Sequence, residues 1–176
     1  ANLTLSVNRI KNYTEYIQNI DDLDNWNMTG RTTAFTYGKA VMLMSPSVTS
    51  MAQLTFMPFR GISSNSLKTL ALKINGRYVG KQYLDNTMTD SRSIPGYFVS
   101  DLSLSHEFRL GKSTETGGRE SAVGIAFYVN NLFNNMYYAD GWCWKNWSEK
   151  ENEVTDGIGI YPQAPRNFML KLSYRF

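Results

Sequence analysis

The sequence is poor in the residues that build metal sites, disulfides and nucleophilic catalysts. It has one cysteine, Cys143, and one histidine, His106, which argues against an internal disulfide, a zinc site and a histidine-based triad. No apolar run approaches the ~18 residues of a membrane-spanning helix. The net charge is only +3, without a basic cluster typical of nucleic-acid binding. We therefore expect no catalytic residue, no metal, no cofactor and no nucleic-acid partner.

What the sequence has instead is alternation of apolar and polar residues, with an aromatic content of 14%. Alternation with a period of two is typical of β-strands that bury one face. In the clearest segment, Phe168, Leu170 and Leu172 alternate with Asn167 and Lys171. The strands that this pattern predicts are 2–11, 50–58, 67–82, 97–110, 121–133 and 167–176. We therefore predict an all-β, antiparallel fold.

The apolar faces of these strands favour a membrane-embedded sheet. A soluble sandwich would alternate as well, but a charge on a lipid face near the bilayer midplane costs ~2–4 kcal/mol, and the central apolar positions carry none. His106, which the pattern directs toward lipid, falls near one end of its strand. The predicted lipid face comprises Leu70, Leu72, Ile74, Leu102, Leu104, Val123, Ile125, Phe127, Leu170, Leu172 and Tyr174. The sequence predicts an up-and-down transmembrane β-barrel.

Six strands cannot close such a barrel. The narrowest membrane barrels have ~8 strands, and an unpaired strand edge is not tolerated in hydrocarbon. We therefore expect further strands from the rest of the polypeptide or from a partner.

The connections between predicted strands alternate in length. Segments 13–47 and 134–165 are long, 60–66 is short, and 83–95 and 111–121 are intermediate. Outer-membrane barrels have long extracellular loops and short periplasmic turns. The pattern predicts a bacterial outer-membrane location, with the long loops outside and the C-terminus at the periplasmic rim.

Three motifs carry a resemblance to a known family. They are NNLFN at 130–134 followed by Tyr137 and Tyr138, YVGKQYLDNT at 78–87, and YPQAPRNF at 161–168 leading to a terminal Phe176. In this order they resemble the C-terminal β-barrel region of TonB-dependent outer-membrane receptors of the Bacteroidota type. The resemblance implies a 22-stranded barrel of which these are the last six strands, with the plug and TonB box outside this chain. It also implies that Phe176 acts as the barrel-assembly signal.

The function implied by the resemblance is TonB-dependent uptake of a scarce nutrient, such as an iron–siderophore complex, haem or cobalamin. The implied partners are outer-membrane lipid, the remainder of the barrel and its plug, the TonB complex, a small-molecule ligand and a possible surface lipoprotein. A structural or adhesive barrel, and a glycan importer of the same superfamily, are the alternatives. An outer-membrane enzyme would need a serine–histidine or aspartate–histidine cluster facing the lumen, whereas His106 is expected to face lipid.

The last long connection gathers the candidate ligand contacts. They are Tyr137, Tyr138, Asp140, Trp142, Trp144 and Trp147. Exposed aromatic rings offer a large, rigid surface for a planar or sugar-like ligand. The alternative is that these rings pack within the loop or against headgroups. Cys143, which lies among them, is expected to be an inert thiol.

Charged residues form two further groups. Lys73, Arg77 and Lys81 would share one face of the third predicted strand as a basic ladder in the lumen, either steering an anionic ligand or pairing with neighbouring carboxylates. Asp21, Asp22 and Asp24 form an acidic group in the first long connection. Without EF-hand spacing, solvated loop charge is expected there rather than a calcium site.

Overall fold

The protein is described by a computed structural model, which covers residues 1–21, 31–62, 66–112 and 120–176. These residues form antiparallel β-sheets and two short 3-10 turns, η2 (Ser66–Thr69) and η3 (Asp90–Arg92), with no α-helix among them. The predicted all-β class is therefore confirmed. None of the described segments is a helix long and apolar enough to cross a membrane.

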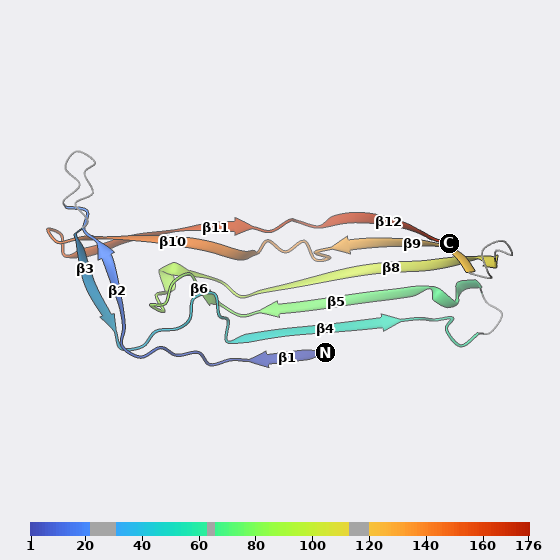
Figure 1. Ribbon diagram of the computed structural model, residues 1–176, viewed down its shortest axis with the longest axis horizontal. Coiled ribbons are helices and arrows are strands. Elements are labelled where there is room, and N and C mark those ends of the chain that lie inside the picture. The colour runs from blue at the N-terminus through green and yellow to red at the C-terminus, as the bar shows by residue number, and fades with distance from the viewer. Residues whose placement is uncertain (22–30, 63–65, 113–119) are drawn as a thin grey trace.

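The largest sheet is an up-and-down meander of six strands (Figure 1). Each strand pairs with the next of these strands along the chain, and all pairings are antiparallel. The outer strands do not pair with each other, so the sheet is open. In spatial order the strands are β1 (Asn2–Leu5), β4 (Val48–Phe56), β5 (Ala71–Val79), β8 (Tyr97–Lys112), β9 (Glu120–Asn130) and β12 (Asn167–Arg175).

The largest departures from the predicted strand bounds are in β1 and β5, and β9 also ends at Asn130 rather than at residue 133. The first strand ends at Leu5 rather than at residue 11, and Asn12 takes a positive φ of 53° shortly afterwards. The strand predicted over 67–82 begins only at Ala71, because η2 precedes it, and ends at Val79. Gly80, the residue after β5, lies close to the backbone of the neighbouring strand β4. A Cβ at this position would lie 3.1 Å from the Val48 carbonyl oxygen.

The predicted long connections contain strands of their own, which the alternation pattern did not predict. Segment 134–165 contains the hairpin β10 (Tyr138–Ser148) and β11 (Glu153–Pro162), and segment 13–47 contains β2 (Tyr13–Gln18) and β3 (Thr32–Tyr37). A short pair, β6 (Gln82–Tyr83) and β7 (Ser93–Ile94), lies between β5 and β8. Figure 1 shows β10 and β11 extending beyond the end of β9 and β12, with β2 and β3 crossing near their far end.

The apolar face of the six-stranded sheet is built from cross-strand rows. In one row Phe56 pairs with Leu72, then Leu104, Phe127 and Leu170. All five side chains are at least 40% exposed, so nothing in the described chain covers this row. Adjacent rows continue the same face with Leu54, Ile74, Leu102, Val129 and Phe168, with Ile125 and Leu172, and with Phe108, Val123 and Tyr174.

One residue of the predicted lipid face lies elsewhere. Leu70 is in the turn between η2 and β5 and is only half-exposed, because β5 begins after it. Every other predicted lipid-face residue lies in a strand of the sheet and follows the predicted parity.

The buried apolar residues of the described chain are divided between this sheet and the elements at one end of the molecule. Those in the sheet are Ala71, Val99, Ala122 and Val129. Ile17, Ala40, Leu84 and Ile94 are all less than 9% exposed, and they belong to the hairpins and connections at one end of the molecule. We call the group formed by β2–β3, residues 81–94 and β10–β11 the hairpin assembly. It packs as a folded unit, whereas the sheet exposes its large side chains.

Candidate functional site

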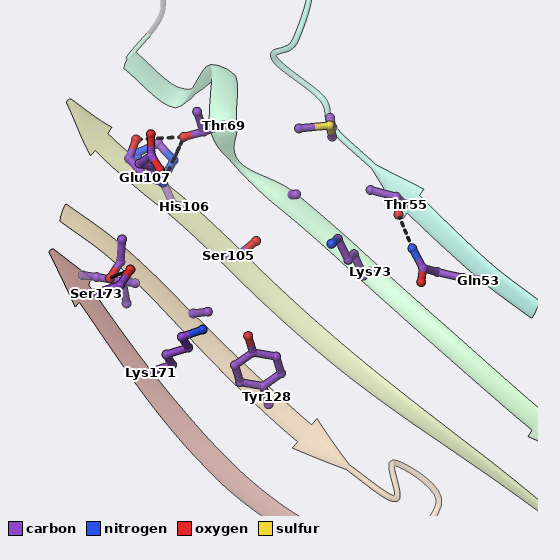
Figure 2. Close-up of a pocket in the computed structure, with 15 residues that line it drawn as sticks. Gln53, Thr55, Thr69, Lys73, Ser105, His106, Glu107, Tyr128, Lys171 and Ser173 are labelled. Atoms are coloured by element: carbon purple, nitrogen blue, oxygen red, sulfur yellow. Dashed lines mark hydrogen bonds between the residues drawn. The ribbon is translucent and has the colours of Figure 1, made fainter. Parts of the chain in front are cut away.

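The polar face of the sheet carries a hollow of about 530 Å³ (Figure 2). The side chains on the floor of the hollow are small, because Ala71, Ser105 and Ala126 occupy one cross-strand row. This row ends at Lys171. The neighbouring row contributes Lys73 and Tyr128, which are larger. Figure 2 shows Lys73 and Lys171 on either side of Ser105, so two cations flank the hollow.

The predicted basic ladder is interrupted. Lys73 and Arg77 share the polar face of β5, and the Arg77 guanidinium lies over the Tyr97 ring, 5.8 Å from its centroid. Lys81 lies beyond the strand, where its Nζ is 2.5 Å from Asp90. Because β5 ends at Val79, the third cation cannot continue the row, and it pairs with a carboxylate instead.

The aromatic candidates divide between the two faces of the β10–β11 hairpin. Trp142 and Trp144 share one face with Asp140, and they are 52% and 42% exposed. Trp147 points to the opposite face, where it meets Phe35 edge-on at 5.0 Å between ring centroids. Trp147 therefore packs against the β2–β3 hairpin, which fits the alternative of packing within the connection, whereas Trp142 and Trp144 stay exposed.

The two tyrosines of the candidate group lie at the base of the hairpin. Tyr137 stacks on Tyr97 with ring centroids 4.6 Å apart, so it joins the polar face of the sheet. Tyr138 begins β10, next to an irregularity in the register before Asp140. The rings of Tyr137 and Tyr138 therefore mark the junction between sheet and hairpin.

The exposed indoles lie over glycines of the paired strand. Trp142 is opposite Gly159 and Trp144 is opposite Gly157. A Cβ added at these glycines would fall 2.2 Å from Trp142 Nε1 and 2.7 Å from Trp144 Nε1. The absence of side chains at 157 and 159 thus lets the indoles cover the strand backbone while leaving one side of each ring to solvent.

A network of buried ion pairs joins the elements of the hairpin assembly. Asp85 accepts hydrogen bonds from Arg92 Nε at 2.6 Å and from Lys145 Nζ at 2.8 Å. Lys145 also pairs with Glu15 of β2, and Arg92 also pairs with Asp156 of β11. The Asp85, Arg92 and Lys145 side chains are only 11%, 5% and 15% exposed, so these charges depend on one another rather than on water.

The pKa values of this network follow from opposing effects. Burial raises the pKa of Asp85, but hydrogen bonds from Lys145, Thr87 and Arg92 outweigh it and hold the pKa below the ordinary value. Burial lowers the pKa of Lys145, but bonds to Asp85 and Glu15 outweigh it and raise that pKa. Burial, followed by the hydrogen bond to Glu15, raises the pKa of Tyr37 to about 12. At neutral pH Asp85 and Lys145 are therefore charged, whereas the Tyr37 hydroxyl keeps its proton.

Acidification is expected to loosen the hairpin assembly. Because the pKa of Asp85 is lower in the folded chain than the ordinary value of 3.8, its contribution to stability is complete above pH 3.8. The contribution is lost as pH falls through the folded pKa. Near-ultraviolet circular dichroism of the packed tryptophans should follow this transition, and Asp85→Asn should flatten it. An unchanged profile in Asp85→Asn would contradict the assignment.

Asp21, from the predicted acidic group, has a structural role. Its carboxylate accepts hydrogen bonds from the backbone N–H groups of Glu149 at 2.5 Å and Lys150 at 2.9 Å, and from the Ser148 hydroxyl at 3.0 Å. The Lys150 N–H contributes most to holding the pKa of Asp21 below its ordinary value. Asp21 thus caps the turn between β10 and β11. Asp22 and Asp24 lie outside the described residues.

The single histidine and the single cysteine also have local partners. His106 Nδ1 is 3.0 Å from the Thr69 hydroxyl, and its ring meets Phe108 edge-on, on the apolar face as predicted. Cys143 donates to the Leu84 carbonyl at 3.4 Å, and burial raises the pKa of its thiol. A raised pKa favours the unreactive thiol form at neutral pH. Neither residue belongs to a group of His, Cys, Asp or Glu side chains that could hold a metal ion, and the described residues contain no such group.

Sequence reasoning missed the ion network. Asp85 lies within the motif at 78–87, but Glu15, Arg92, Lys145 and Asp156 come from segments treated as loops. The available signal was alternation in 140–147, where Trp142 and Trp144 alternate with Cys143 and Lys145. Reading that segment as a strand would have placed Lys145 and the exposed indoles on opposite faces.

Comparison with known proteins identifies no family for this chain. No protein-family model matches the chain, and no curated protein gives a significant match.

Proposed function

We propose that the chain forms six neighbouring strands of a bacterial outer-membrane β-barrel, belonging to a TonB-dependent receptor that imports a scarce nutrient. The apolar face of the six-stranded sheet carries this proposal. Its rows of leucine, isoleucine and phenylalanine are exposed, and the described residues on that face of β4, β5, β8, β9 and β12 include no Asp, Glu, Lys or Arg. An uncharged apolar surface that crosses five strands fits acyl chains and does not suit water.

The open edges support a larger barrel. The outward edges of β1 and β12 have no partner within the described sheet. Unpaired backbone groups are costly in hydrocarbon, so a membrane location requires further strands at both edges. The motif resemblance supports a total of 22 strands, with the plug supplied from outside this chain.

The distribution of hairpins supports an orientation. All three small hairpins lie at one end of the sheet (Figure 1). Because outer-membrane barrels carry their larger connections outside the cell, this end is extracellular. The opposite end is then periplasmic, with Phe176 there as the assembly signal, and TonB would act on the part of the receptor outside this chain.

Ligand capture is proposed for the exposed face of β10–β11. Trp142 and Trp144 offer two rigid rings on a hairpin that the ion network holds in place. Such rings suit the planar or ring-containing surfaces of siderophores, haem and cobalamin. The hollow on the polar face, with Lys73 and Lys171, would lie along the lumen below.

The test uses a bacterial strain that lacks the chromosomal gene for this protein. It measures growth of that strain and ligand binding by the full-length protein. Complementation with the full-length protein should restore growth on one iron or cobalamin source. Trp142→Ala with Trp144→Ala should weaken ligand binding by about tenfold, because each aromatic contact contributes about 0.5–1.5 kcal/mol. Tyr16→Ala, which removes a 73% exposed aromatic ring from the neighbouring hairpin, is the matched control.

A second variant tests whether the position of the two indoles matters, and not only their presence. Gly159→Val keeps both indoles but forces Trp142 off the strand, and it should also weaken binding. Normal growth of the deletion strain on every iron and cobalamin source would overturn the uptake proposal. Loss of growth only on a glycan, or loss of surface adhesion alone, would favour the alternative barrels.

A further inference from the structure

A second pocket lies where the β2–β3 hairpin joins the sheet. Its volume is about 570 Å³, and it is separate from the hollow on the polar face. The residues that line it come from three connections of the chain. They are Arg9, Ile10, Lys11, Asn12, Gly38, Lys39 and Met88.

The backbone around this pocket is well fixed. Ile10 and Ala40 exchange two backbone hydrogen bonds, of 2.8 and 2.9 Å, which close the base of the hairpin. Ala40 is completely buried, so this closure is packed as well as bonded. Asn12 and Met88 take positive φ angles of 53° and 60° at the pocket wall. The third connection is linked to the first by the Arg9 guanidinium, 3.4 Å from the Met88 sulfur.

The charged residues that line this pocket are all cationic. Three of the seven lining residues are cationic and none is acidic. Elsewhere in the hairpin assembly, Lys81, Arg92 and Lys145 each pair with a carboxylate. For Arg9, Lys11 and Lys39, by contrast, no ion pair is found within the described part of the chain. The three side chains are exposed, so water and salt weaken their mutual repulsion, and an anion bound among them would interact favourably with all three.

We propose that this pocket is a binding site for a phosphate group, contacted by Arg9, Lys11 and Lys39. A phosphate presents several acceptor oxygens and up to two negative charges, which matches a site offering three cationic donors. Ile10 and the Met88 side chain add apolar wall next to the cations. Both a phosphorylated lipid headgroup and a free phosphate-bearing solute satisfy this chemistry. The site lies apart from Trp142 and Trp144, and it does not depend on the proposed uptake function.

The experiment measures phosphate binding to the full-length protein in a non-ionic detergent. Calorimetry would use inorganic pyrophosphate as the soluble probe and short-chain phosphatidic acid as the lipid probe. Short-chain phosphatidylcholine, whose phosphate is a diester in a neutral headgroup, serves as the comparison lipid. Lys11→Gln with Lys39→Gln should weaken binding by about tenfold or more, because hydrogen bonds to charged groups are among the stronger ones.

A charge-matched control is available at the other end of the sheet. Arg60→Gln with Lys68→Gln removes the same two charges from the turn region that precedes β5, and it should leave binding unchanged. Binding of pyrophosphate that only the pocket variant weakens would support a soluble ligand. Binding of phosphatidic acid alone, with the same variant dependence, would support a lipid headgroup. Absence of binding to both probes, or equal weakening by both variants, would overturn the proposal.

Discussion

Asp85→Ala is expected to lower the free energy of opening the hairpin assembly by about 3–5 kcal/mol, the usual range when one partner of a buried ion pair is removed. Asp85 holds both Arg92 and Lys145, whose side chains are only 5% and 15% exposed. Without the carboxylate, two buried cations lose a shared partner, and the N–H and hydroxyl of Thr87 lose an acceptor. The damage should therefore spread to every element that the network joins.

Amide hydrogen exchange of the full-length protein measures this effect locally. Protection should fall in β2, β10 and β11, while β5 and β8 of the sheet keep theirs. Asp90→Ala is the matched control, because it also removes a carboxylate from a lysine pair, but Asp90 is 81% exposed. Such a surface pair contributes about 0–1 kcal/mol. Equal loss of protection in the two variants would show that the buried network does not hold the hairpins together.

Ile74→Arg is expected to cost about 2–4 kcal/mol of membrane-folded stability, the penalty for arginine on the lipid face near the bilayer midplane. Ile74 is near the middle of β5, in a row with Leu54 and Leu102. Its side chain is 36% exposed on the apolar face. An arginine there would place its charge among acyl chains if the proposed membrane location is correct.

Asn75→Arg provides the control at the same depth. Asn75 is the next residue of the strand, faces the polar side and pairs with Asp101 in register, so an arginine there gains a carboxylate neighbour. Folding into lipid vesicles and the amount of protein in the outer membrane should fall for Ile74→Arg and stay normal for Asn75→Arg. Equal behaviour of the two variants would contradict a lipid-facing surface at Ile74.

The sequence predicts the sheet well because apolar and polar residues alternate with a period of two in each of its strands. Leu72, Leu104 and Leu170 come from three separate segments, yet parity alone places them in one cross-strand row. Parity does not reveal where strands end. Lys81 keeps the parity of Lys73, but the chain leaves β5 at Val79 and turns toward Asp90.

The hairpin assembly was not predictable in the same way. Its strands carry glycine and charged residues among the apolar ones, so alternation marks only part of them, such as 140–147. Trp142 and Gly159 illustrate the reason, since a glycine contributes to this sheet by leaving room for an indole from the opposite strand. The ion network depends on pairs far apart in sequence, such as Glu15 and Lys145, which no local pattern connects.

The pairing of Glu15 with Lys145 spans 130 positions of the chain. Contacts of such separation form late, because the intervening chain must first be brought together. The β2–β3 hairpin is accordingly expected to dock late in folding, after β10 has paired with β11, so its protection from hydrogen exchange reports this late step.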